Sequence, residues 1–164
     1  MKHPITQTSN GAEVYVELIH SEASSHIALQ PHLLGLVKEA LTQLKVRPSA
    51  TSIELDMGRD IGYDFVIETA EADTVFYAKL IHENVYMRFV KNGETLSTHF
   101  LTILLQHDGD NTYELRDAWI GRLRPALPGS ENESDASKSY WSNHAYIFNG
   151  QSLQARTITK VCPY

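Results

Sequence analysis

Apolar residues recur at helical spacing in one early part of the chain, over residues 31–45. The members of this stripe are Leu33, Leu34, Val37, Leu41 and Leu44. A stripe of this kind is typical of a helix that packs one face against a core. Pro31 suits the first helical position, and Pro48 with the polar run that follows it ends the pattern. We therefore predict a helix over 31–45 that packs on a sheet.

After this helix the pattern changes to short apolar or alternating segments that are separated by turn sequences. The strands predicted in this way are 52–57, 63–69, 74–81, 85–91, 96–106 and 112–120. The turns between them lie at 58–62, 82–84, 92–93 and 108–111. The pair Asn92-Gly93 is a strong signal for a two-residue hairpin. Successive hairpins predict an antiparallel meander, so the expected fold class is α+β, with an N-terminal helix packed on an antiparallel sheet.

The remaining segments are less regular. Residues 1–12 are polar and are predicted to form a loose arm. Residues 13–20 fit either a strand or the first turns of a helix, because the pattern does not separate the two. Residues 121–139 contain prolines and an acidic, serine-rich patch, and they predict a long loop that serves either a function or only a surface excursion. An ordered aromatic segment follows at 140–148, and 152–159 is predicted as a last strand.

Length and composition indicate an ordinary globular protein. The chain has 164 residues, of which 42% are hydrophobic and 21% are charged, and this length favours a single domain over 1–164. No apolar run approaches the roughly 18 residues that a membrane helix needs. The single cysteine, Cys162, excludes an internal disulfide framework and a zinc site built on several cysteines. The N-terminus has no apolar signal segment, so we expect a soluble, cytoplasmic protein.

Charge is distributed unevenly along the chain, whose net charge is −6. Residues 13–73 hold 11 acidic and 4 basic residues, whereas residues 74–125 hold 6 of each. Residues 138–164 hold 3 basic residues and no acidic one. A nucleic-acid-binding domain usually presents a basic face. The acidic residues of 13–73 therefore argue against binding of nucleic acid. The neutral predicted sheet and the basic C-terminal segment argue against it less strongly.

The predicted sheet carries polar side chains that suit phosphate chemistry. His99 can transfer a proton near neutral pH, and the neighbouring Thr98 can orient a phosphate. Lys79 and Arg88 can neutralise a phosphate or the charge that develops on it in a transition state. Tyr113 can stack on a base or donate a hydrogen bond.

Arg122 and Tyr86 are further candidates for the same roles. Each of these side chains also has a structural interpretation, because the wet face of a sheet carries polar residues without any function. Only convergence of several of them on one point would favour a site, and spacing along the chain does not show convergence.

A second cluster lies at 140–145, where Trp141 and His144 are three residues apart and share a face if this segment is helical. His144 then reaches a site, or it is a structural histidine beside a tryptophan anchor. The sequence contains no HExxH, calcium loop, GxGxxG, Walker loop or GxSxG motif, so we expect no metal site and no cofactor.

The stretch 74–122 resembles the core of the barnase–EndoU–colicin–RelE-like ribonuclease superfamily, which is familiar from bacterial toxin systems and phages. The segments that carry the resemblance are Phe76-Tyr77-Ala78-Lys79, Tyr86-Met87-Arg88-Phe89, Thr98-His99, Tyr113-Glu114-Leu115, Ala118-Trp119-Ile120-Gly121, Tyr140-Trp141 and His144-Ala145.

The resemblance implies a toxin-like nuclease that cleaves RNA without a metal, by attack of the ribose 2′-hydroxyl on the adjacent phosphate. His99 would be the first candidate for proton transfer, and His144 would be a second one. Arg88 and Lys79 would stabilise the phosphate. The remaining site residues implied by the resemblance, which would orient the phosphate, are Tyr113 and Thr98.

Two other classes of function stay open. A non-catalytic protein of the same fold would bind a protein partner through its sheet, such as an antitoxin or immunity protein, or would form a homodimer. A small-molecule-binding α+β barrel would instead use the histidines to line a cavity. Because no membrane segment is predicted, we expect no membrane partner.

Overall fold

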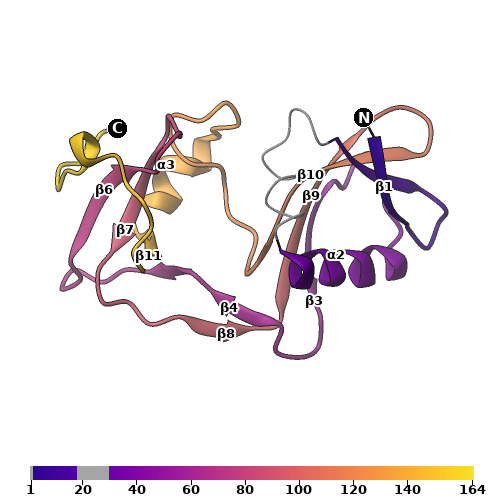
Figure 1. Ribbon diagram of the computed structural model, residues 1–164, viewed down its shortest axis with the longest axis horizontal. Coiled ribbons are helices and arrows are strands. Elements are labelled where there is room, and N and C mark those ends of the chain that lie inside the picture. Colours follow the sequence, from indigo (N-terminus) through magenta and orange to yellow (C-terminus); the bar gives the residue numbers. More distant parts are fainter. Residues whose placement is uncertain (1, 18–29) are drawn as a thin grey trace. The chain divides into compact units, whose positions relative to one another are not determined.

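The computed structural model describes residues 2–17 and 30–164 (Figure 1). The chain divides into two compact units. Unit 1 comprises Met1–Gly62 and Ser97–Leu123, and unit 2 comprises Tyr63–Leu96 and Arg124–Tyr164. Each unit is therefore assembled from two separate stretches of sequence. Whether the units unfold together is a matter of energetics, so the single domain over 1–164 stays a prediction.

The described chain is mixed α+β, with many strands and two α-helices. The sheets are largely antiparallel, which confirms the predicted class. The helix is not the first element, because the strands β1 and β2 precede α2 (Pro31–Gln43). The arrangement is also not a simple meander, because one pair of strands in each of the two larger sheets is parallel. Neither of the two helices is both long and apolar enough to cross a membrane.

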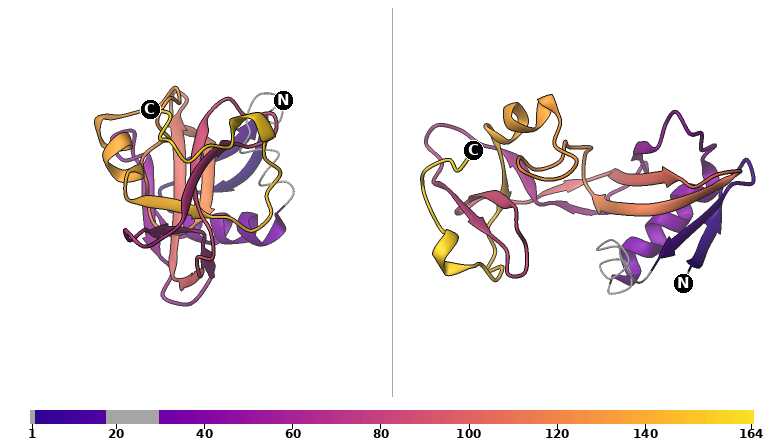
Figure 2. Two further views of the ribbon diagram at one scale, coloured as in Figure 1. Left: turned by 90° about the vertical axis from the view of Figure 1, so that its left-hand side faces the viewer. Right: turned by 90° about the horizontal axis from the view of Figure 1, so that it is seen from above.

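Unit 1 is built on a five-stranded sheet with the order β1-β2-β10-β9-β3. Its strands are β1 (Lys2–Gln7), β2 (Glu13–Glu17), β3 (Ser52–Asp56), β9 (Phe100–His107) and β10 (Thr112–Ile120). The right-hand view in Figure 2 shows β9 and β10 side by side as a long hairpin. The hairpin predicted at 108–111 is thereby confirmed.

The loose arm predicted over 1–12 is wrong, because β1 pairs antiparallel with β2. The intervening turn is held by Thr8, whose hydroxyl accepts a hydrogen bond from the Ala12 amide at 3.1 Å. Ile5 packs against the core. Backbone pairing therefore orders a segment whose side chains are mostly polar. For residues 13–20, β2 decides in favour of a strand up to Glu17, and 18–20 lie outside the described residues.

The helix predicted over 31–45 is confirmed as α2, which lies along one face of this sheet (Figure 1). Pro31 occupies the first turn, and the chain becomes extended at Leu44. The buried residues of the helix are Leu33, Leu36, Val37, Ala40 and Leu41. They share a core with Leu101, Ile103 and Leu105 of β9. This row of β9 is therefore the core face of the strand.

Strand β1 is tied to the β9–β10 turn by an ionic cluster at Asp108. The Lys2 ammonium lies 2.8 Å from the Asp108 carboxylate, and the Tyr15 hydroxyl donates a hydrogen bond to the same oxygen. The Lys2 ammonium also lies 4.5 Å from the centre of the Tyr15 ring. The hydrogen bond from Lys2, followed by the one from Tyr15, holds the pKa of Asp108 below its ordinary value.

We expect this cluster to make stability depend on acidic pH. A carboxylate with a lowered pKa contributes stability above its unfolded pKa of about 4, and the contribution is lost as the pH falls through the folded value. The melting temperature should therefore fall more steeply below pH 5 in the wild type than in Asp108→Asn, as followed by circular dichroism. Asp110→Asn, in the same turn, should behave as the wild type. Parallel curves for Asp108→Asn and the wild type would contradict this role.

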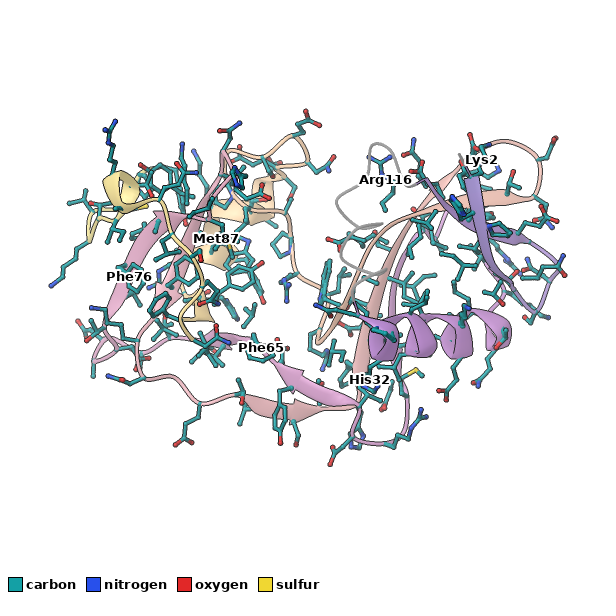
Figure 3. The ribbon with its side chains drawn as sticks, viewed as in Figure 1. Lys2, His32, Phe65, Phe76, Met87 and Arg116 are labelled. Carbon is teal, nitrogen blue, oxygen red and sulfur yellow. The ribbon has the colours of Figure 1, made fainter. Side chains whose placement is uncertain are left out.

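Unit 2 contains a four-stranded sheet with the order β5-β11-β7-β6. Its strands are β5 (Val66–Glu68), β6 (Val75–Lys79), β7 (Tyr86–Val90) and β11 (His144–Ile147). The predicted hairpin between β6 and β7 is confirmed. One face packs Phe76, Ala78 and Phe89 with Met87, and Figure 3 labels Phe76 and Met87 in this layer. The other face has a smaller apolar cluster of Val90, Ala145 and Ile147.

The hairpin predicted at Asn92-Gly93 is wrong. Strand β7 belongs to the sheet of unit 2, whereas β9, the main strand after the turn, belongs to the sheet of unit 1. Asn92 does adopt a positive φ of 59°, so the local turn forms. Gly93 is needed for packing, because a Cβ at this position would lie 3.0 Å from a side-chain carbon of Ile147 and 3.1 Å from one of Ile67. The turn therefore directs the chain away from β7 instead of back along it.

Two further predictions are wrong, namely the hairpin between 52–57 and 63–69 and the regular last strand over 152–159, whereas the strand predicted at 52–57 does form as β3. Residues 52–57 and 63–69 do not pair: β3 joins the sheet of unit 1, while 62–68 divides into β4 (Gly62–Asp64) and β5. β4 pairs with β8 (Leu96–Thr98) in a separate two-stranded ribbon. Residues 152–159 form a 3-10 turn and two isolated bridges, because the Gln154 side chain caps the carbonyls of Leu80 and Glu83 instead of allowing a regular ladder.

The long loop predicted over 121–139 ends earlier than expected. Helix α3 (Asp135–Trp141) begins within it, after Ser134. The Ser134 amide donates a hydrogen bond to the Ser137 hydroxyl at 3.0 Å, which forms half of a capping box. The serine-rich character of the segment is therefore explained by helix initiation.

Candidate functional site

The six predicted site residues divide equally between the two units. Thr98, His99 and Tyr113 belong to unit 1, and the other three, Lys79, Arg88 and His144, belong to unit 2. Convergence of all six on one site stays a prediction.

In unit 1, His99 lies between two carboxylates. Its Nδ1 is 3.7 Å from Asp56 Oδ1, and its Nε2 is 3.1 Å from Asp60 Oδ1. The imidazole is 47% exposed, so solvent reaches it. The two carboxylates, as negative charges, repel an approaching phosphate. Thr98 uses its hydroxyl locally, as the acceptor of a hydrogen bond from the Phe100 amide at 3.1 Å.

Tyr113 is part of the core of unit 1, with 1% of its surface exposed. Its ring lies 5.2 Å from that of His107. Arg122 is paired with Glu54 at 3.0 Å, and its guanidinium lies 3.9 Å from the centre of the Phe100 ring. The charge of Arg122 is therefore balanced within the protein.

In unit 2, Arg88 is a buried cation that has no ion-pair partner among the described residues. It is 8% exposed, and its Nη1 donates to the Thr69 hydroxyl at 2.8 Å and to the His144 carbonyl at 3.2 Å. Both of these acceptors are neutral. The buried Nε has no hydrogen-bond partner in the part of the chain that the structure describes. Within residues 2–17 and 30–164, no carboxylate forms an ion pair with Arg88.

Lys79 shares a sheet face with Arg88. Strands β6 and β7 pair Tyr77 with Arg88 and Lys79 with Tyr86. Alternate residues of a strand point to the same side, so these four side chains lie on one face, which we call the Arg88 face. The Lys79 ammonium lies 4.9 Å from the centre of the half-buried Tyr86 ring. The structure thus places two of the predicted phosphate-binding cations on the same face of one sheet.

His144 contacts Arg88 through its backbone rather than through its ring. The ring stacks on Tyr140, with a centroid distance of 3.8 Å and an angle of 4°. The helical face predicted for Trp141 and His144 is wrong, because Trp141 ends α3 and His144 begins β11. Trp141 instead stacks on Tyr146 at 5.0 Å.

Burial dominates the electrostatics around the Arg88 face. The pKa of the Tyr77 hydroxyl is raised mainly by burial, and the nearby Arg88 opposes that rise. Burial also raises the pKa of Tyr164 to about 12, and Tyr77 adds to this effect. Both phenols are therefore neutral at physiological pH and are able to donate a hydrogen bond. They do not supply a negative charge for Arg88.

Sequence reasoning did not assign roles to Thr69, Tyr77 or Tyr164. The signal for Tyr77 was its two-residue spacing from Lys79, which places both side chains on one face of a strand. Thr69 and Tyr164 had no signal, because they reach the Arg88 face through tertiary contacts.

No group of three or more His, Cys, Asp or Glu side chains in the described chain is placed to hold a metal ion. Comparisons of the sequence and the structure with protein-family models, curated proteins and solved structures found no match. The functional interpretation therefore depends on the geometry of the two units.

Proposed function

We propose that this protein binds RNA, and that the Arg88 face of unit 2 holds a phosphate of the RNA backbone. The observation that carries the proposal is the buried guanidinium of Arg88, which has a free Nε–H and no carboxylate partner in the described chain. A buried charge is costly unless it is paired. A bound phosphate would supply both the missing charge and the missing acceptor.

The neighbours of Arg88 suit a nucleotide ligand. Lys79 adds a second cation on the same face, and a flexible ammonium contacts phosphate as a point charge. Tyr86 lies beside it with a half-buried ring, on which a base can stack. This combination of cations and an aromatic ring favours RNA over a simple inorganic anion.

Cleavage of the bound RNA is a further step that the Arg88 face does not by itself explain. The leading candidate for proton transfer, His99, belongs to unit 1 and lies beside Asp56 and Asp60. A toxin-like ribonuclease activity therefore stays a prediction. Its assay is degradation of RNA in EDTA, which His99→Ala should abolish. Binding of a protein partner, homodimer formation and a small-molecule cavity also stay predictions.

Lys79→Met is expected to weaken binding of a fluorescently labelled single-stranded RNA by about fivefold, and to reduce the slope of log affinity against log salt by about 1. The physical reason is the loss of one exposed phosphate contact. Anisotropy titrations at low and physiological salt measure both quantities.

Lys91→Met is the matched control for this experiment. Lys91 follows β7 directly, and its ammonium lies 5.5 Å from the centre of the Phe76 ring, on the other side of the sheet. The Lys91→Met substitution removes the same charge from the same unit as Lys79→Met does. Equal losses in the two variants would show that only net charge matters, and the assignment of the Arg88 face would then be wrong.

A further inference from the structure

The Arg88 face is crossed at its edge by the last residues of the chain. Thr159 pairs with Tyr77 of β6 through two backbone hydrogen bonds, of 2.7 and 2.9 Å. The segment 160–164, which we call the C-terminal strap, continues from there. Its Tyr164 ring packs edge-on against the Tyr77 ring at 5.8 Å. Since Tyr77 lies directly opposite Arg88 in the strand pair, the strap ends beside the buried guanidinium.

The contacts of Tyr164 agree with this placement. Burial raises its phenol pKa, and Arg88 is close enough to act on that pKa in the opposite direction. The Tyr77 hydroxyl also interacts with both Arg88 and Cys162 of the strap. The strap therefore lies near the Arg88 guanidinium.

The strap itself is weakly attached. In the described chain, the backbone of 160–164 forms no hydrogen bond to another backbone group beyond the Thr159 pair. Val161 is 74% exposed, and Cys162 is exposed as well. Its main anchor is the aromatic contact between Tyr164 and Tyr77, beside the interaction of Cys162 with the Tyr77 hydroxyl. Segments with few buried contacts and an exposed backbone open at low free-energy cost.

We propose that the C-terminal strap is a displaceable cover of the phosphate site, which competes with RNA for access to Arg88. The inference rests on the proposed function of the Arg88 face. Tyr164 occupies the approach to the guanidinium in the closed state, and it must leave Tyr77 before a phosphate reaches the Nε–H. The apparent affinity for RNA is then the intrinsic affinity reduced by the fraction of molecules in which the strap is open.

The test compares Tyr164→Ala with Tyr164→Phe in the 164-residue chain, using the same labelled single-stranded RNA. Tyr164→Ala removes the anchoring ring and should bind RNA about tenfold more tightly than the wild type, because the open fraction rises. Tyr164→Phe keeps the ring and should bind as the wild type does. Val161→Ala, in the exposed part of the strap, should also leave the affinity unchanged. Melting temperatures show that each variant is folded.

The outcomes separate the strap from the site beneath it. Tighter binding by Tyr164→Ala, or binding by that variant alone, supports the strap. In a second outcome, the wild type binds RNA, Arg88→Met does not, and Tyr164→Ala binds no more tightly than the wild type. This outcome overturns the strap and leaves the proposed function intact. Absence of binding by both the wild type and Tyr164→Ala overturns the proposed function and the strap together. Inorganic phosphate, used as a competitor, shows whether the displaced contact is to the phosphate group.

Discussion

Arg88→Met is expected to weaken RNA binding on the order of 100-fold while changing the free energy of unfolding by less than about 1 kcal/mol. Binding is lost because the buried guanidinium is the main proposed partner of the phosphate. Stability is retained because Arg88 has no carboxylate partner in the described chain, so its removal relieves an unpaired buried charge and leaves no opposite charge buried alone. This gain offsets the loss of its hydrogen bonds to the Thr69 hydroxyl and the His144 carbonyl. Methionine has a similar length and fills the space with apolar atoms.

A large loss of stability without a specific loss of RNA affinity would identify Arg88 as a structural residue. Its Nη1 donates hydrogen bonds to the Thr69 hydroxyl and to the His144 carbonyl. If the role of Arg88 were purely structural, it would be to hold Thr69 and β11 together. In that case Arg88→Met would lower the free energy of unfolding by about 3 kcal/mol or more. It would do so without a specific effect on RNA.

Urea denaturation and anisotropy titration of the same samples measure both quantities. Arg156→Met is the control, because Arg156 is an exposed arginine of unit 2 in the 3-10 turn Ala155–Thr157. It should change RNA affinity by no more than about threefold, as expected for one exposed charge. RNA affinity that is unchanged in Arg88→Met would refute the proposed site.

Trp141→Ala is expected to destabilise unit 2 by about 3–5 kcal/mol. Trp141 is 1% exposed and stacks on Tyr146. Its indole N–H donates a hydrogen bond to the Pro125 carbonyl at 3.1 Å, so truncation creates a cavity and also leaves a partly buried carbonyl without its donor. A change of this size is a large part of the stability of an ordinary domain.

The same variant tests whether the two units unfold as one domain. The chain has two tryptophans, and Trp141→Ala leaves Trp119 of unit 1 as the remaining fluorophore. The single-domain prediction expects the urea midpoint followed by Trp119 fluorescence to fall together with the midpoint followed by circular dichroism. A Trp119 midpoint equal to that of the wild type would show that unit 1 unfolds independently.

A converse variant places the change in unit 1. Leu115 is fully buried in the core beneath α2, and Leu115→Ala should cost about 2–5 kcal/mol. In the background of Trp119→Phe, Trp141 then reports on unit 2. Coupled unfolding predicts a lowered midpoint in this variant too.

Local sequence was sufficient for the elements whose contacts are near in the chain. The α2 helix follows from its apolar stripe and Pro31, and the β6–β7 and β9–β10 hairpins follow from turn residues between apolar segments. The errors of prediction occur where the pairing partner of a segment is distant in the sequence. β1 is ordered by β2, and the segment after Asn92-Gly93 joins the sheet of the other unit.

The candidate site shows the same division. Strand alternation predicts that Tyr86 and Arg88 share a face of one strand. Only the observed register of β6 and β7 brings Tyr77 and Lys79 to that same face. Spacing did not show that Arg88 is buried against neutral partners, that Tyr113 lies in a core, or that two carboxylates flank His99.

The sequence by itself therefore determined the α+β class, one helix and two hairpins, since these depend on periodicity and turn chemistry over a few residues. Tertiary structure alone decided which sheet each strand joins, and it decided which polar side chains are buried without a charged partner. The reason is physical: burial and the balance of charge depend on contacts between residues far apart in the chain. Arg88 with Thr69, and Tyr77 with Tyr164, are such contacts.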